Sequence, residues 1–126
     1  KPMYVTEGPL DSLFLPNSIA VGGTGFNRLD HLFLPKARLT VIIDNQPRNA
    51  DVCKVYDRMI KAGYKVFIWP EYTSAKDIND MVKSGMRPEY IEMVVDQNSH
   101  SGLIAEMELK VWKRVADSRT KKYSTP

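Results

Sequence analysis

The sequence predicts an α/β fold, in which helices flank a central, mostly parallel sheet of four strands. Short apolar runs alternate along the chain with segments of helical periodicity, and this alternation is typical of parallel sheets with helices on both faces. The run at positions 39–43 is apolar except for Thr40, as expected of a strand that is covered on both sides. Carboxylates follow several of these runs, where a site at the strand ends would need them.

The first half of the chain is expected to contain three strands and two helical segments. Pro9 suits the first turn of a helix and Pro16 stops that helix. Apolar residues recur at helical spacing later in this half, after a glycine-rich turn. The expected strands are Met3–Thr6, Ser18–Val21 and Arg38–Asp44, and the expected helical segments are Pro9–Leu15 and Phe26–Leu34.

The middle of the chain is expected to contain one helix and the fourth strand. Asn49 or Asp51 can cap the helix with its side chain. Apolar residues then follow at helical spacing, so one face of this helix should lie on the sheet. Gly63 is a natural stop for the helix, and the strand Tyr64–Trp69 comes next.

Three further helices are expected in the last part of the chain. The first begins after Asp77 and ends at Gly85, and the second begins at Pro88. Ser101 can cap the third. The apolar positions expected to face the core from this last helix are Ile104, Met107, Val111 and Val115, with Trp112 at the edge of that face.

Length and composition indicate one globular domain of a larger protein. A chain of 126 residues is long enough to bury a core, and no apolar run approaches the roughly 20 residues that span a bilayer. A start at Lys1 rather than methionine suggests a domain of a longer protein, and a remnant of an expression tag is the alternative. The single cysteine, Cys53, excludes an internal disulfide and a cysteine-rich zinc site. Reducing, cytosolic conditions fit this content, and the basic segment 117–126 is expected to be a flexible tail that follows a domain over residues 1–116.

Three acids follow strands of the predicted sheet. Glu7 and Asp44 come at the ends of two strands, and Asp77 lies just beyond the fourth. Ligands of open α/β sheets sit outside the carboxyl ends of the strands, so the fold is expected to gather these carboxylates at one edge. Clustered carboxylates repel one another unless a cation joins them, and Mg²⁺ or Mn²⁺ prefers oxygen ligands. Such ions bind nucleotide phosphates and activate a hydroxyl for in-line attack.

Two cations and a structural alternative complete this interpretation. Lys76 and Arg48 lie beside the acids in sequence and can hold phosphate charge. In the alternative, each acid has a structural role: Glu7 and Asp44 cap the segments that follow them. Asp77 and Asp80 then lie in the first turn of their helix, where the helix dipole favours negative charge.

Three motifs in order resemble the Toprim domain of phage DNA primases. Val5-Thr6-Glu7-Gly8-Pro9-Leu10-Asp11 resembles the first Toprim motif, a strand that ends in Glu-Gly with an Asp three residues later. Ile42-Ile43-Asp44-Asn45-Gln46 stands where that family has Asp-x-Asp. Lys76-Asp77-Ile78-Asn79-Asp80 is similar to the Lys-Asp-x-Asn motif of phage primases. The resemblance covers nearly the whole chain and is closest to the T-even-type phage primases.

The resemblance implies a Toprim-like, Rossmannoid fold and a metal-dependent nucleotidyltransferase. Such primases copy single-stranded DNA into short RNA primers from ribonucleoside triphosphates, work with a replicative helicase, and would act in the cytoplasm of the infected bacterium. Carried over by motif, Glu7 handles a proton or holds Mg²⁺ or Mn²⁺, and Asp44 and Asp77 are metal ligands. Lys76 meets a triphosphate or the primer backbone, and Asp11 supports the site.

One departure from the family pattern leaves other functions open. Gln46 stands where the second acid of Asp-x-Asp is expected, so a two-metal site would need Asp80 or substrate phosphates in its place. The zinc-binding module and the upstream polymerase subdomain of such primases have no counterpart in this sequence. The alternatives are a Toprim nuclease or topoisomerase-like protein that cleaves phosphodiesters, and a non-catalytic Toprim module that binds nucleic acid or a helicase.

Overall fold

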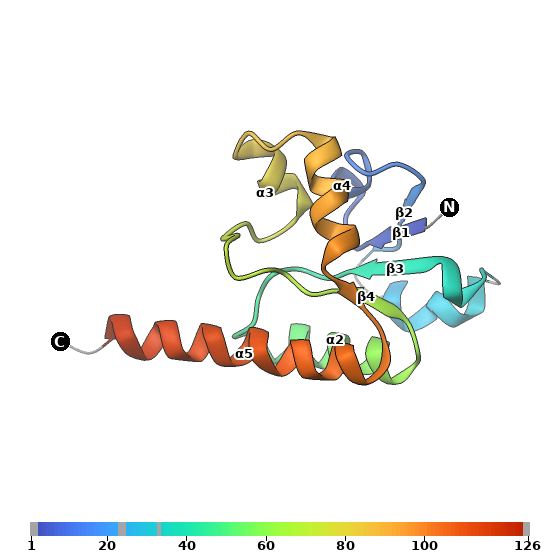
Figure 1. The fold of residues 1–126 in the computed structure, drawn as a ribbon. Coiled ribbons are helices and arrows are strands. Elements are labelled where there is room, and N and C mark those ends of the chain that lie inside the picture. The colour runs from blue at the N-terminus through green and yellow to red at the C-terminus, as the bar shows by residue number, and fades with distance from the viewer. Residues whose placement is uncertain (1–2, 23–24, 33, 125–126) are drawn as a thin grey trace.

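The computed structural model describes residues 3–22, 25–32 and 34–124, which form an α/β fold around one sheet (Figure 1). The strand order is β2-β1-β3-β4-β5, and the first four strands of this order are parallel. The α/β fold with a mostly parallel sheet is therefore confirmed. The strands are β1 (Met3–Thr6), β2 (Ser18–Ala20), β3 (Leu39–Ile42), β4 (Lys65–Phe67) and β5 (Ser99–His100).

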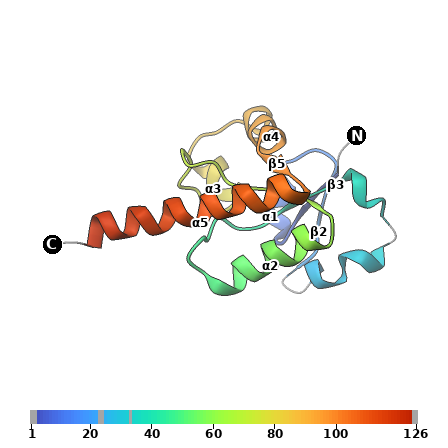
Figure 2. The same ribbon diagram turned by 60° about the horizontal axis from the view of Figure 1, so that its bottom comes forward.

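Helices cover both faces of the sheet. Figure 1 shows α3 and α4 on one side and α2 and α5 on the other. Figure 2 shows α5 running alongside α2. The helices are α1 (Pro9–Ser12), α2 (Ala50–Lys61), α3 (Ile78–Lys83), α4 (Pro88–Gln97) and α5 (Gly102–Ser124), with 3-10 helices η1 (Gly25–Leu32) and η2 (Lys36–Arg38). Within the described ranges, no helix combines the length and apolarity needed to cross a membrane.

The middle of the sheet is buried from solvent because helices cover it on both sides. Val5, Val41 and Val66 stand side by side in neighbouring strands, and each has an exposed fraction of 0%. All four residues of β3 are buried, whichever face they point to. A continuously apolar run is required for a strand in this position, and the sequence of β3 supplies it.

The predicted number of four strands is wrong, because the structure contains a fifth. Strand β5 pairs antiparallel with β4, opposing His100 to Val66 and Ser99 to Phe67. The Ile68 N–H also donates to the Asn98 carbonyl at 2.9 Å, next to this pair. A two-residue strand of polar side chains has no alternation to detect, since backbone pairing alone defines it.

The predicted core face of the last helix is also wrong. Ile104, Met107 and Val111 are 60%, 59% and 46% exposed. Among the side chains of α5 that the structure describes, the buried ones are Ala105, Leu109 and Trp112, which recur at an equally helical spacing. The indole of Trp112 decides the rotation of the helix, since it packs on the Tyr56 ring of α2 with centroids 4.7 Å apart. The side chain of Val115 lies outside the described part of the chain. The backbone of residues 117–124, expected as a tail, continues α5 as helix to Ser124.

Candidate metal centre

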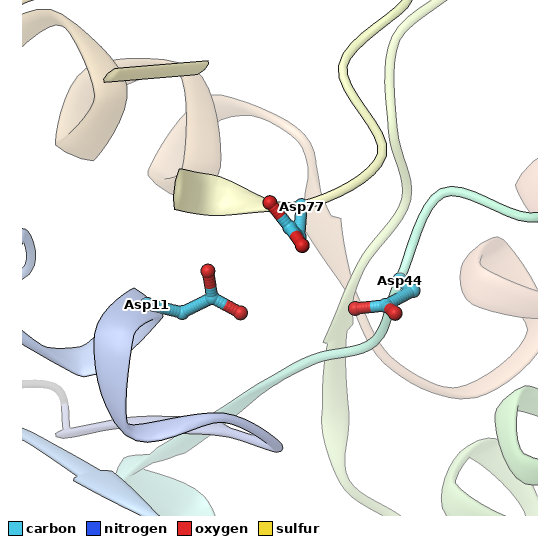
Figure 3. A group of neighbouring side chains, drawn as sticks. All are labelled: Asp11, Asp44 and Asp77. Carbon is cyan, nitrogen blue, oxygen red and sulfur yellow. The ribbon is translucent and has the colours of Figure 1, made fainter. Parts of the chain in front are cut away.

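Three carboxylates converge at the carboxyl edge of the sheet. Asp11, Asp44 and Asp77 each offer an oxygen, and these oxygens lie within 4.8 Å of one another (Figure 3). Asp11 belongs to α1, Asp44 follows β3, and Asp77 precedes α3. We call these three residues the acidic cluster. Their assembly at one edge is what the parallel order of the strands dictates.

Asp11 joins the first helix of the chain to the third. Helix α1 begins with Pro9 directly after Gly8, and this turn places Asp11 in a buried position with 9% exposure. Its Oδ1 accepts a hydrogen bond of 2.8 Å from the backbone N–H of Asn79, at the start of α3. One oxygen thereby fixes the side chain, and the other remains available to a cation.

Asp77 is both a helix cap and a member of the acidic cluster. Its Oδ1 accepts a hydrogen bond of 2.8 Å from the N–H of Asp80, which satisfies one free donor of α3. The Asp80 carboxylate in turn accepts from the Lys76 N–H at 3.3 Å. Asp77 is therefore the N-cap of α3, whereas the structural alternative placed it in the first turn, where the structure has Asp80. The cap is compatible with metal binding because it uses one oxygen of Asp77.

Two buried aromatic side chains hold the backbone around Asp44. The indole Nε1–H of Trp69 donates to the Ile43 carbonyl at 2.7 Å. The Tyr56 hydroxyl lies 3.1 Å from the same oxygen and 3.3 Å from the Asp44 carbonyl. Tyr56 and Trp69 are 0% and 2% exposed. Since core residues fix the chain here, Asp44 is placed by packing rather than by a mobile loop.

Asn45 connects the Asp44 segment to the segment that carries Asp77. Its N–H donates to the Lys76 carbonyl at 2.6 Å, and its Nδ2–H donates to the Ala75 carbonyl at 2.9 Å. Its Oδ1 accepts from the Trp112 indole at 2.9 Å. Asn45 and Trp112 therefore position the acidic cluster, although the sequence interpretation assigned neither to the site. No local pattern identifies them, because their partners are distant in sequence.

The pKa values of two carboxyl groups in the acidic cluster are raised, as expected where a cation would stabilise the charged form. Burial, followed by the charges of Glu7, Asp77 and Asp11, raises the pKa of Asp44 from 3.8 to about 6, with Lys76 acting in the opposite direction. Burial also raises the pKa of Asp11, against the hydrogen bond from Asn79, and the neighbouring acids add to the rise. Mutual repulsion of this kind is relieved when a divalent ion binds.

The spacing of the oxygens also suits such an ion. Metal–oxygen bonds of about 2.1 Å place two ligands on opposite sides of a Mg²⁺ ion roughly 4.2 Å apart. The oxygens of the acidic cluster lie within 4.8 Å of one another, which is close to this separation. The donor set consists of carboxylates, which Mg²⁺ and Mn²⁺ prefer. Asp11, Asp44 and Asp77 thus fit a hard divalent cation.

The structure groups Asp11, rather than Glu7, with Asp44 and Asp77. The prediction made Glu7 a ligand and Asp11 a supporting residue, whereas Asp11 belongs to the acidic cluster. Glu7 is exposed and lies beside the cluster, near enough to raise the pKa of Asp44. Helix α1 explains the difference, because it folds the chain back so that Asp11 approaches Asp77 and the first turn of α3.

The other predicted site residues surround the acidic cluster. Lys76 is exposed and close enough to lower the pKa of Asp44. Asp80 is half-buried and near Asp11, whose pKa it raises. Gln46 is half-buried, and its N–H donates to the Asp44 carbonyl at 2.9 Å. Arg48 is exposed on the segment that leads into α2.

Comparison with known proteins finds a similar protein in a bacteriophage. No model of a known protein family matches the chain. The chain is 38% identical over 116 residues to the DNA primase of Enterobacteria phage T4, which covers 90% of this chain. It spans 33%, about a third, of the length of that primase. The resemblance to phage DNA primases seen in the three motifs is thus confirmed: over nine-tenths of its length, this chain is similar to a third of a phage DNA primase.

Proposed function

We propose that the chain is the metal-binding catalytic Toprim domain of a DNA primase. The observation that carries this proposal is the acidic cluster at the carboxyl edge of the sheet, in a chain similar to a phage DNA primase. Its substrates would be ribonucleoside triphosphates and a single-stranded DNA template, and its product a short RNA primer. A replicative helicase would be its partner, and the cytoplasm of the infected bacterium its location.

Asp11, Asp44 and Asp77 would hold the Mg²⁺ or Mn²⁺ ion. When bound, such an ion supplies charge stabilisation to the phosphoryl group and helps to ionise the attacking hydroxyl. The pKa of Asp44 is raised to about 6. At neutral pH its carboxylate is therefore mostly ionised and could bind the ion. Glu7, which is exposed beside the cluster, would accept a proton from the primer hydroxyl. Lys76 and Arg48 carry the charge that would hold phosphates.

Primer synthesis by the full-length primase tests this proposal. We expect Asp11→Asn and Asp44→Asn each to reduce synthesis by at least about a hundredfold, since each removes a charged ligand of the ion. Asp57→Asn is the matched control, because Asp57 is an exposed aspartate of α2 outside the cluster, 3.9 Å from Lys113. Near-normal synthesis by both cluster variants would disprove the proposal.

A non-catalytic module is the second candidate, and Gln46 is the observation that favours it. An amide oxygen can ligate a metal but carries no charge, so a second ion would be held less tightly at this edge. Calorimetric titration of the 126-residue chain with Mn²⁺ separates the candidates. Binding that requires Asp11 and Asp44 supports the catalytic domain, whereas no binding at millimolar Mn²⁺ supports the module. Nicking of plasmid DNA by the chain with Mn²⁺ would instead assign a Toprim nuclease.

A further inference from the structure

A cavity of about 290 Å³ lies directly beside the acidic cluster. Its walls come from two sources: the strand ends with η1 on one side, and one face of α2 on the other. We call it the α2 cavity. Its lining residues are Glu7, Phe26, Ile43, Asp44, Asp51, Val52, Lys54, Val55 and Arg58.

Charges of both signs line this cavity. The strand ends contribute the carboxylates of Glu7 and Asp44, and α2 contributes Lys54 and Arg58, one helical turn apart, together with the carboxylate of Asp51 in its first turn. Both cations are exposed to solvent. Among the residues that the structure describes, neither forms an ion pair. Apolar residues also line the cavity, including Phe26 at 5% exposure.

The start of α2 does not itself supply an anion site. The Asn49 side chain accepts hydrogen bonds from the N–H groups of Asp51 at 2.9 Å and Val52 at 3.1 Å. Because the Asn49 side chain accepts from the N–H groups of Asp51 and Val52, these two donors are not open to an anion. The side chains of Lys54 and Arg58 are therefore the groups of this wall that can bind phosphate.

We propose that the α2 cavity binds the triphosphate of an incoming nucleoside triphosphate, with Lys54 and Arg58 as its phosphate-binding residues. This inference rests on the proposed function and extends it to a substrate subsite. A polyanion cannot approach Glu7 and Asp44 alone, because like charges repel. A divalent ion held by Asp11, Asp44 and Asp77 would offset the charge of the carboxylates, and the phosphates would then also be attracted to Lys54 and Arg58.

The size and lining of the cavity define what it recognises. At about 290 Å³ it is at the lower end of the range for ligand pockets, about 300 to 1,000 Å³. It can accept a triphosphate and part of a ribose, but it does not enclose a base. We therefore expect the α2 cavity to contribute affinity for any ribonucleoside triphosphate and no selection among bases.

Calorimetric titration of the 126-residue chain with ATP in the presence of Mn²⁺ tests the inference. We expect Lys54→Gln and Arg58→Gln each to weaken ATP binding about five- to tenfold, the loss of one charge-assisted contact. Lys54→Arg keeps the charge and should bind within about twofold of the parent. The matched control is Lys61→Gln, because Lys61 is an exposed lysine of the same helix that does not line the cavity.

The titrations distinguish this inference from the proposed function. Binding of Mn²⁺ without ATP should be unchanged in Lys54→Gln and Arg58→Gln, because neither residue is in the acidic cluster. The inference is supported if the two variants bind Mn²⁺ as tightly as the parent but bind ATP more weakly. ATP binding by the parent should also be lost in EDTA. Parental ATP affinity in both variants, or Mn²⁺ binding without any ATP binding by the parent, overturns the inference and leaves the metal site intact. Weaker binding of a single-stranded oligonucleotide with unchanged ATP binding would also overturn it.

Discussion

Replacing Asp44 by asparagine should stabilise the metal-free protein. The asparagine keeps the shape of the side chain and removes a negative charge that burial and three nearby acids oppose. The rise of the Asp44 pKa from 3.8 to about 6 corresponds to roughly 3 kcal/mol for a fully buried group. Because Asp44 is only half-buried, solvent screening reduces the gain to about 1 to 2 kcal/mol.

The gain should depend on pH in a defined direction. Below the unfolded pKa of 3.8, the Asp44 carboxyl is neutral in both states and destabilises nothing. Between 3.8 and about 6, the unfolded state releases the proton while the folded state retains it, so parental stability falls as the pH rises. Above about pH 6, Asp44 is ionised in the folded protein, and its charge destabilises the folded state by the full amount. Asp44→Asn should therefore match the parent near pH 4 and exceed it at pH 7.5.

Thermal unfolding in EDTA, followed by circular dichroism, measures this difference. At pH 7.5 we expect Asp44→Asn to raise Tm by about 4 to 8 °C, the shift for about 1 to 2 kcal/mol in a domain of this size. Asp57→Asn should leave Tm within about 1 °C. With Mn²⁺ at a hundred times its Kd, the parent should gain about 2.7 kcal/mol and the variant much less. A lower Tm for Asp44→Asn in EDTA would refute the reasoning.

The remaining predictions concern the metal ligands and the contacts that position them. Asp11→Asn should weaken Mn²⁺ binding by at least about tenfold, and Glu7→Gln by about threefold or less. The difference is expected because, of these two acids, Asp11 belongs to the acidic cluster. If calorimetry gives the reverse order of Mn²⁺ affinities, Glu7 rather than Asp11 is the ligand. Tyr4→Phe removes the hydrogen bond of 2.6 Å from the Tyr4 hydroxyl to Asp96 and should cost about 1 to 2 kcal/mol of stability in urea unfolding; an unchanged midpoint would contradict this. Trp112→Phe keeps an aromatic ring beside Tyr56 but loses the hydrogen bond to Asn45. We expect this variant to lose about 1 to 3 kcal/mol of folding stability and to bind Mn²⁺ more weakly. Tyr90→Phe, at an exposed position, should change neither the stability nor the Mn²⁺ affinity.

Local patterns in the sequence predicted the layers of the fold. The apolar run of β3 requires cover on both faces, and the alternation of strands with helices favours parallel order. These two facts place the segments after β1, β3 and β4 at one edge of the sheet. Asp44 and Asp77 were predictable for this reason, since each follows a strand directly or after a short loop.

The composition of the acidic cluster depended on contacts between distant segments. Glu7 ends a strand and was the natural ligand from sequence, yet Asp11 approaches Asp77 because its carboxylate bonds to Asn79, 68 residues away. The same reason applies to Asn45, whose partners are Ala75, Lys76 and Trp112. Spacing along the chain carries no information on such pairs, because the packing of α1 and α5 decides them.

The sequence by itself determined the α/β class, the parallel order and the edge at which acids gather, because periodicity and burial are local properties of the chain. Only the tertiary structure decided which face of α5 is buried, which of Glu7 and Asp11 joins the cluster, and where Lys54 and Arg58 lie relative to it. Each of these outcomes depends on contacts with segments that are distant in the sequence. Two side chains with the same helical spacing, or with the same charge, look alike in the sequence, and only one of them makes such a contact.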